Sequence, residues 1–360
     1  MVTRTSRTTA DSLAASSYKI GYVEAQVHAA ISSWRISPEQ RKRLYAVMGR
    51  KGKTSKPTLA DFKARDKLTR LLIKAMKRHW RQHRDQHHYV FISIIHSIGN
   101  TTDNRPEVAL DAFKAMARKA IAQLGVSAIG MIEAQGIMNY PGGMLGRTLM
   151  FHGHFVGFAR DVSHIQDAVD TLNASRAWHT TFGALPIDVS VLDDVAGIVE
   201  WMAHYFSKMP NDAKNLMPHN GKPGRVRMMN TTIGYRPEFA LRIYEGLSQI
   251  PITDAIFGVG AKSLLNPVRK KLLAWHKRRS GPTLPNSAVP KLWRQLRAVN
   301  GSRRFLPYKF LTGSERPTPL NQPVIVERKV RSGNRVQTRK TTAMQRLLGA
   351  RRGRCNLDDL

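Results

Sequence analysis

The chain has 360 residues, and its 58 Lys and Arg against 25 Asp and Glu give a formal net charge of +33 at pH 7. A hydrophobic fraction of 42% argues against a chain that is disordered throughout, and the single cysteine, Cys355, excludes internal disulfides and cysteine-based zinc clusters. Such a basic chain is expected to act on a polyanion, nucleic acid first; no long apolar run or basic amphipathic anchor stands out, so no membrane partner is expected.

Residues 1–85 are predicted to form a basic helical N-terminal region. Apolar residues recur at helical spacing over residues 31–44 and again over residues 61–80. The second stretch carries many cations, and whether they contact nucleic acid or only solvent stays open. These cations are Lys63, Arg65, Lys67, Arg70, Lys74, Lys77 and Arg78.

Strands and helices alternate in the middle of the chain. The short, apolar, β-branched stretch over residues 89–97 predicts a buried strand. After it we expect a helix over 105–125, strands over 126–136 and 146–158 joined by a turn at 139–143, a helix over 161–175, a strand over 184–192 and a helix over 193–210. The β-α-β-β-α-β order is that of a ferredoxin-like split sheet. The predicted fold class is therefore α+β, an antiparallel sheet with helices on one face.

The end of the chain is predicted to differ from its centre. Residues 225–235 are expected to form a strand, and residues 236–250 and 266–279 to form helices. From residue 267 onward there are 23 Lys and Arg against 4 Asp and Glu, among many Pro, Gly and Ser. We therefore expect a central domain over residues 86–265, followed by a basic, loosely ordered DNA-binding tail over residues 266–360.

A short glycine-containing stretch, GVGAKS over residues 258–263, is similar to a phosphate-binding loop but lacks the required glycine directly before Lys262. Nucleotide binding is not expected. A helicase acting with this protein would therefore be a separate protein.

Three polar residues are predicted to meet on neighbouring strands. Alternation places His152 and His154 on one face of their strand, and Glu133 lies on the preceding strand. The two strands should pair antiparallel, which lets the carboxylate and both imidazoles converge. Such a set, with room for water or substrate, is typical of an open site for a divalent cation, and the cation can act as a Lewis acid on a phosphoryl oxygen.

The helix over residues 193–210 contributes a second chemical element. Tyr205 and Lys208 are three residues apart and therefore share one helix face, near Trp201. A tyrosine beside a metal and a cation is a candidate nucleophile. Its ordinary pKa of about 10 means that the site has to favour the phenolate.

The combined motifs resemble the HUH endonuclease superfamily, the replication initiators and relaxases that nick one DNA strand. The resemblance rests on FHGHFVGF at the histidine strand, GMIEAQG at the strand of Glu133 and HYFSK at the tyrosine helix. It implies that His152, His154 and Glu133 bind Mg²⁺ or Mn²⁺. It also implies that Tyr205 attacks the scissile phosphate with help from Lys208. Gly153 departs from the bulky apolar residue of the family, and the one tyrosine indicates a single-tyrosine type.

The resemblance implies a function as well. The expected activity is metal-dependent, site- and strand-specific DNA nicking and rejoining through a 5′-phosphotyrosine intermediate, which initiates rolling-circle replication. The expected partners are single-stranded or hairpin origin DNA and a separate helicase. The expected setting is the bacterial cytoplasm, near the nucleoid, for a protein encoded by the host, a phage or a plasmid.

Other readings remain open. A conjugative relaxase or an HUH transposase would use the same residues. In another class, the chain would be a non-enzymatic basic nucleic-acid-binding protein whose histidines belong to the core. An H-x-H pair and a Y-x-x-K pair are each common by themselves, so the prediction depends on their joint order and spacing.

Overall fold

The computed structural model describes residues 24–25, 27–29, 31–32, 35–102, 106–138, 147–180, 185–206, 214–218, 226–230 and 237–300. The chain divides into two compact units, Met1–Thr312 and Gly313–Leu360, and every described residue belongs to the first. The turn predicted at residues 139–143 and the candidate residue Lys208 lie outside the described residues.

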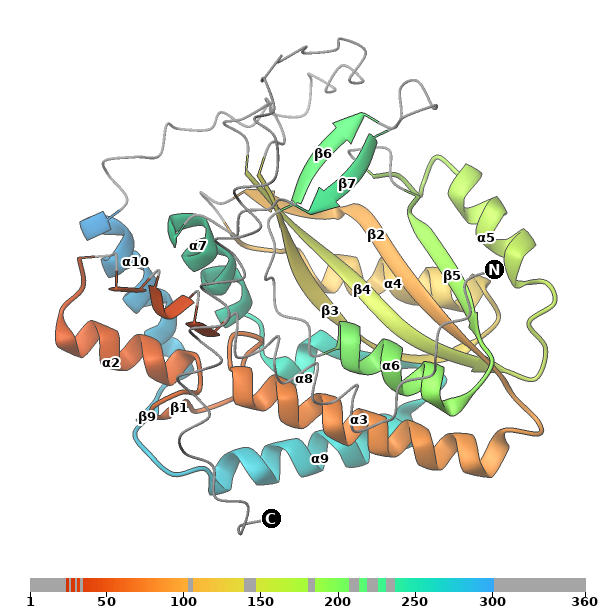
Figure 1. Cartoon of the computed structure of the whole chain (residues 1–360), viewed down its shortest axis with the longest axis horizontal. Helices are drawn as coiled ribbons and strands as arrows, with labels where there is room; N and C mark the ends of the chain where they lie inside the picture. The colour runs from red at the N-terminus through yellow and green to blue at the C-terminus, as the bar shows by residue number, and fades with distance from the viewer. Residues whose placement is uncertain are drawn as a thin grey trace, which may run out of the picture. The chain divides into compact units, whose positions relative to one another are not determined.

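A curved, mostly antiparallel sheet runs through the first unit (Figure 1). Its strand order is β5-β2-β4-β3-β6-β7, and β8 also pairs with β3. The four long strands all pair antiparallel, and all four were predicted: β2 (His88–Thr102), β3 (Ser127–Ile137), β4 (Thr148–Ala159) and β5 (Ile187–Leu192). The shorter strands are β6 (Lys214–Pro218), β7 (Val226–Asn230) and β8 (Ile256–Val259). β3 and β4 are buried along nearly their whole lengths, so the core is built around them.

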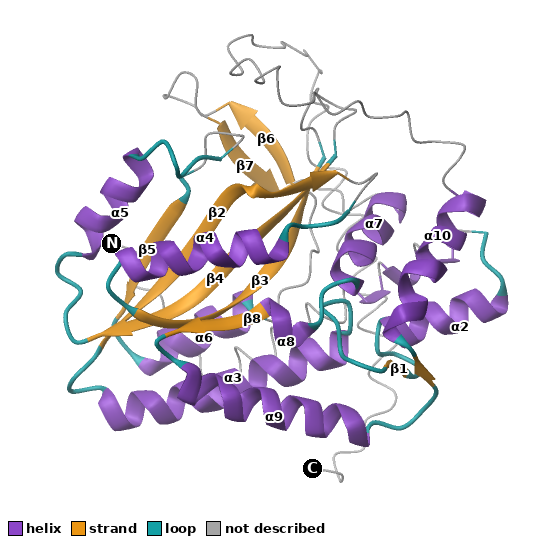
Figure 2. Ribbon diagram, turned by 180° about the vertical axis from the view of Figure 1, so that it is seen from behind, coloured by secondary structure: helices purple, strands orange, loops and turns teal. Residues whose placement is uncertain are grey.

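Helices pack on both faces of the sheet, so the prediction of helices on one face is wrong. α4 (Leu110–Gln123) lies over one face, as Figure 2 shows, and places Phe113 beside Gly153 of β4. α6 (Val195–Tyr205) covers the opposite face and places Trp201 against Phe91 of β2. The physical reason is that β3 and β4 are apolar on both faces, and each face has to be covered.

The remaining helices surround these layers. α3 (Phe62–His83) packs against both α6 and α9. None of the described helices combines the length and the apolar character that a membrane crossing requires. The other helices are α2 (Pro38–Val47), α5 (Ile165–Ala174), α7 (Pro237–Ser248), α8 (Ile252–Ala255), α9 (Lys262–Arg278) and α10 (Val289–Asn300), with the 3-10 turn η2 (Asn286–Ala288).

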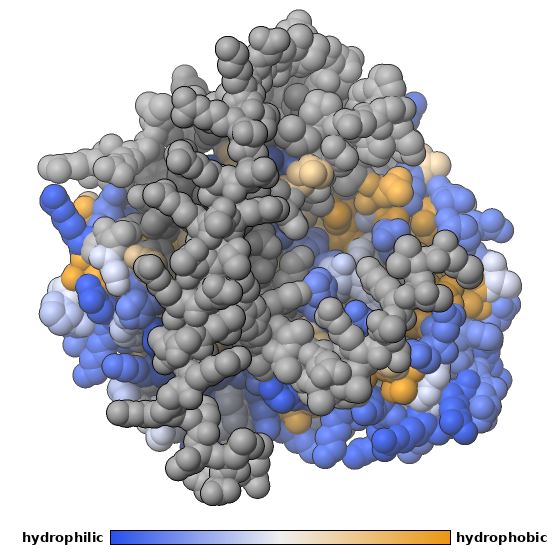
Figure 3. All heavy atoms as spheres, viewed as in Figure 1, coloured by the Kyte–Doolittle hydropathy of each residue, from blue (hydrophilic) through white to orange (hydrophobic). Residues whose placement is uncertain are grey.

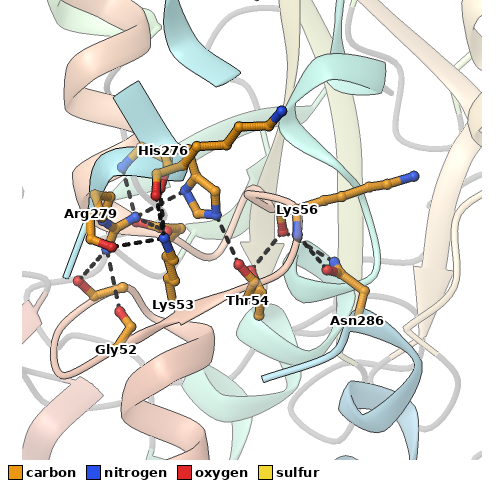
Figure 4. A network of polar contacts seen from close by, with 11 residues as sticks. Gly52, Lys53, Thr54, Lys56, His276, Arg279 and Asn286 are labelled. Atoms are coloured by element: carbon orange, nitrogen blue, oxygen red, sulfur yellow. Dashed lines mark hydrogen bonds and ion pairs between the residues drawn. The ribbon is translucent and has the colours of Figure 1, made fainter. Parts of the chain in front are cut away.

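A network of polar contacts, which we call the clasp, joins residues 49–61 to residues 276–286 (Figure 4). Its centre is the buried ammonium group of Lys53, which donates to the carbonyl oxygens of His276, Lys277 and Arg279 at 3.1, 2.9 and 2.7 Å. These carbonyls end α9, where helix carbonyls lack partners within the helix and the helix dipole favours a cation. Beside them β1 (Lys53–Thr54) pairs with β9 (Thr283–Leu284).

The clasp also holds the beginning of α3. Asp61 caps this helix by accepting from the backbone N–H of Ala64 at 2.9 Å, and its carboxylate accepts a hydrogen bond from the guanidinium of Arg279 as well. Arg279 donates further to the carbonyl of Gly49 at 2.7 Å. The first turn of α3 is therefore fixed by a residue that lies more than two hundred positions later in the chain.

The helix expected over residues 266–279 is confirmed as part of α9, but the expectation of a loosely ordered tail from residue 266 is wrong for residues 266–300. These residues form most of α9 and all of α10, and the indole of Trp293 in α10 is buried and donates to Ser248 of α7 at 2.7 Å. Apolar residues at helical spacing among the many cations supply the packing face. Residues 301–360 lie outside the described residues, and the division of the chain into three domains stays a prediction.

Replacing Lys53 with Met tests the clasp. The variant keeps the length of the side chain but leaves three carbonyls at the end of α9 without their donor. We expect the free energy of unfolding to fall by about 2–4 kcal/mol in denaturant titration. Lys56→Met is the matched control, because Lys56 is exposed and its side chain points away from the network (Figure 4). The control should change stability by less than about 0.5 kcal/mol. Equal effects of the two variants would contradict this account.

Candidate metal centre

Glu133, His152 and His154 meet on one face of the sheet. The register of β3 and β4 places Glu133 directly opposite His152, and Met131 opposite His154. Glu133 Oε1 lies 2.8 Å from His154 Nε2 and 3.3 Å from His152 Nε2. One ligand atom from each residue lies within 4.8 Å of the others, so this group could hold a metal ion.

The hydrogen bonds of the two imidazoles suit metal ligands. His152 Nδ1 lies 3.3 Å from the carbonyl oxygen of Met150, which can only accept, so Nδ1 carries the hydrogen. In the neutral ring, the lone pair of Nε2 then faces the carboxylate of Glu133, and a proton or a cation has to lie between the two acceptors. The Nδ1 of His154 lies 3.0 Å from Ser93 Oγ. A ring held through its second nitrogen in this way is the common arrangement of metal-bound histidine.

Arg65 supplies a positive charge behind the carboxylate. Its side chain comes from α3 and is fully buried, and its Nη2 lies 3.9 Å from Glu133 Oε2. Burial lowers the pKa of Arg65, while the charges of Glu133 and Tyr244 act in the opposite direction. The two oxygens of Glu133 thus face different partners, Oε1 the histidines and Oε2 the guanidinium.

Arg65 and Ser93 are the contributors to this site that sequence reasoning missed. The sequence pattern groups Arg65 with the cations of α3 as a possible nucleic-acid contact, which its burial rules out. The sequence does contain a signal for the burial of Arg65, because Arg65 lies on the apolar stripe of the helix with Leu68 and Leu72. A cation on a buried stripe needs a buried partner. Ser93 can be assigned only once the register between β2 and β4 is known.

The ring of Tyr205 closes one side of the group. Its centroid lies 4.3 Å from that of His154 and 4.9 Å from that of Phe91. Trp201, one turn earlier, stacks on it at 5.1 Å with an interplanar angle of 12°. The structure therefore brings the candidate nucleophile to the candidate metal ligands, whereas Lys208 lies outside the described residues. Its role and that of Tyr205 stay predictions.

The site is closed, contrary to the expectation of an open site with room for substrate. Glu133, His152 and His154 are 2%, 5% and 5% exposed. The reason is that the same face of β2 carries Phe91, and its ring stacks against His154 at 5.4 Å. A phosphate can reach the three ligand atoms only when covering side chains move.

At two positions next to the site, Gly153 and Gly99, the packing leaves no room for a side chain. A Cβ on Gly153 would point away from the histidines and lie 2.5 Å from a ring carbon of Phe155, so a bulky residue between the histidines would displace that ring. β2 bulges between Ile95 and Asn100, beside His152. In this bulge a Cβ on Gly99 would lie 2.1 Å from the carbonyl oxygen of Phe151. Bulges of this kind are frequent next to functional sites.

Comparisons of the chain with protein-family models, with curated proteins and with solved structures found no match. The site therefore has to be interpreted from its own chemistry.

Removing the charge of Arg65 tests whether Glu133 faces a cation site. Arg65→Met leaves a buried carboxylate without its guanidinium, and we expect the free energy of unfolding to fall by about 3–5 kcal/mol. Added Mn²⁺ should recover much of this loss, because a divalent cation bound at Glu133 replaces the missing charge. Thermal unfolding with and without Mn²⁺ measures both effects, and Mn²⁺ should raise the unfolding temperature of the variant more than that of the wild type.

The matched control is Arg242→Met, which removes another buried arginine, one that forms an ion pair with Glu245 at 2.7 Å. This control should lose stability but gain no more from Mn²⁺ than the wild type does. Arg65→Lys should lose less stability than Arg65→Met. An equal response of all variants to Mn²⁺ would contradict this account, because the loss of the guanidinium would then make no difference to metal binding.

Proposed function

We propose that this protein is a metal-dependent DNA-nicking enzyme of the HUH type, which cuts and rejoins one strand and initiates rolling-circle replication. The observation that carries the proposal is the convergence of Glu133, His152 and His154 with the ring of Tyr205 directly against His154. Each motif is common by itself. Their meeting at one place in the fold, from β3, β4 and α6, is what the resemblance requires.

The strand order adds support. In chain order the elements are β2, α4, β3, β4, α5 and β5, and in the sheet the strands lie in the order β5-β2-β4-β3 with antiparallel pairs throughout. This is the order expected of a ferredoxin-like split sheet, the core that the resemblance implies. α6, which follows β5, then lies on the face of the sheet that carries the histidines.

The donor set fits a divalent cation. Two imidazoles with one carboxylate suit Mn²⁺ better than Mg²⁺, which prefers oxygen ligands, and we propose Mn²⁺ or Mg²⁺ as the ion. When bound, such an ion would polarise an oxygen of the scissile phosphate. Arg65 keeps the carboxylate of Glu133 compensated, so the three ligands can remain together before the ion arrives.

The chemical step belongs to Tyr205. Its phenolic oxygen forms a bond to the phosphorus, the bond to the 3′ oxygen breaks, and the proton lost by the phenol balances the one gained by the leaving 3′ oxygen. The products are a 5′-phosphotyrosine and a free 3′-OH that can prime DNA synthesis. Attack by a 3′-OH reverses the step and rejoins the strand. Lys208 is proposed to stabilise the charge that develops on the phosphate.

A non-enzymatic nucleic-acid-binding protein is the second candidate, and one observation favours it. Glu133 already faces Arg65 and both histidines, and all four side chains are buried. An ion-pair cluster of this kind could serve the fold alone. The two candidates differ in whether a covalent protein–DNA product forms.

Detection of a covalent protein–DNA product distinguishes the two candidate functions. Incubating the protein with Mn²⁺ and a labelled pool of randomised single-stranded DNA should give a protein–DNA adduct on a denaturing gel, and Tyr205→Phe should give none. Tyr45→Phe, at a tyrosine that stacks on His28, is the matched control and should form the adduct normally. The double variant His152→Ala and His154→Ala should still bind DNA but form no adduct. A wild type that binds DNA without any adduct would favour the non-enzymatic candidate.

A further inference from the structure

The outward face of α3 carries an unbroken row of basic side chains. They lie three or four residues apart, except for the adjacent Lys77 and Arg78, which places them on one face of the helix. All are exposed or half-buried, and we call them the cationic row: Lys63, Lys67, Arg70, Lys74, Lys77, Arg78 and Arg81. Arg65 points from the opposite face of the same helix into the metal centre. The row is therefore a second feature, outside the proposed site.

The row is long and nearly uniform in charge. From Lys63 to Arg81 it extends over about 27 Å at 1.5 Å per residue. α3 contains one acidic residue, Asp66, which forms an ion pair with Arg70 at 2.9 Å. The surface over α3 is hydrophilic in the space-filling view, along the lower right edge of Figure 3.

α9 packs along α3 and adds cations to this side of the molecule. Its sequence contains no Asp or Glu, and five of its basic residues are exposed: Lys262, Lys270, Lys271, Lys277 and Arg278. A surface with two adjacent basic helices attracts a polyanion over a wide area.

We propose that the cationic row binds double-stranded DNA through its phosphates. A row of about 27 Å matches about eight base pairs at 3.4 Å each. The single-stranded alternative lacks support on this surface, since single strands are held by stacking of bases on exposed aromatic side chains. Among the described residues, the exposed large hydrophobic side chains are aliphatic: Leu185, Val191, Met229, Leu273 and Val299. A row of exposed Lys and Arg favours a duplex that is bound through its phosphate backbone.

This proposal goes beyond strand nicking, because it assigns a duplex-binding surface outside the metal centre. It requires only that DNA is the partner. Duplex binding at the row with no covalent adduct would leave this inference standing and remove the proposed function. Formation of the adduct without any contribution of the cationic row to duplex binding would support the proposed function and remove this inference.

The experiment measures binding to a labelled duplex and to a single strand of equal length by fluorescence anisotropy, across salt from about 50 to 200 mM. The row variant replaces Lys63, Lys74, Arg78 and Arg81 with Gln. The matched control replaces Lys42, Lys119, Arg176 and Lys291 with Gln, which removes the same charge from exposed positions elsewhere. Gln preserves helix propensity, and circular dichroism checks the folding of both variants.

We expect the row variant to bind the duplex about tenfold or more weakly than the control variant does at low salt. Its plot of log affinity against log salt should flatten by roughly 0.9 for each phosphate that the protein no longer neutralises. Equal weakening in both variants would overturn the proposal, because net charge alone would explain it. A larger effect on the single strand than on the duplex would identify a different occupant and overturn it as well.

A measurement on the unaltered protein guards against effects of substitution. Lysine acetylation followed by mass spectrometry, with and without the duplex, should show protection of Lys63 and Lys74. Lys119 on α4, exposed on the other side of the sheet, should react equally in both samples. Protection of Lys119 alone would place the duplex on that side and overturn the assignment.

Discussion

A carboxylate that is almost fully buried needs a compensating charge, and the way this chain meets that need ties its parts together. Glu133 lies in the middle of β3 with both oxygens engaged, one by the histidines of β4 and the other by Arg65. Arg65 comes from a helix far earlier in the chain. The charge balance of the sheet therefore fixes the position of α3 against it, and α3 in turn packs on α6, which carries Tyr205. Moving any one of these elements would expose a buried charge to solvent or leave it without its partner.

The alternating pattern of the strands made the meeting of Glu133 with the two histidines predictable. Alternation placed Glu133 and the two histidines on facing positions, and the observed register pairs Glu133 with His152 directly. The same pattern could not show which helices cover the site. Strands that are apolar on both faces do not reveal which element lies on which side. Tyr205 was expected beside the ligands from the resemblance, but the covering by Phe91 and the closed state of the centre emerged only from the fold.

Charge was harder to interpret than apolar periodicity. The high density of cations after residue 266 suggested a loose tail, although a helix was also expected over residues 266–279. Leu265, Val268 and Leu272 form the packing face of that helix in α9. In α3, counting cations concealed the difference between Arg65, which is buried, and its exposed neighbours. A cation's position relative to the apolar stripe decides its role, because burial makes a partner obligatory while exposure leaves it available to an outside ligand. α3 thus presents one cation to the interior and a row of them to solvent.

The clasp sets an order of events for a chain emerging from the ribosome. Lys53 binds carbonyls that lie 223 residues or more further along the chain, so the end of α9 has to be synthesised before the start of α3 is fixed. Contacts between such distant segments form late, because the intervening chain has to be ordered first. An interrupted product ending before residue 276 would therefore lack the clasp that fixes the start of α3.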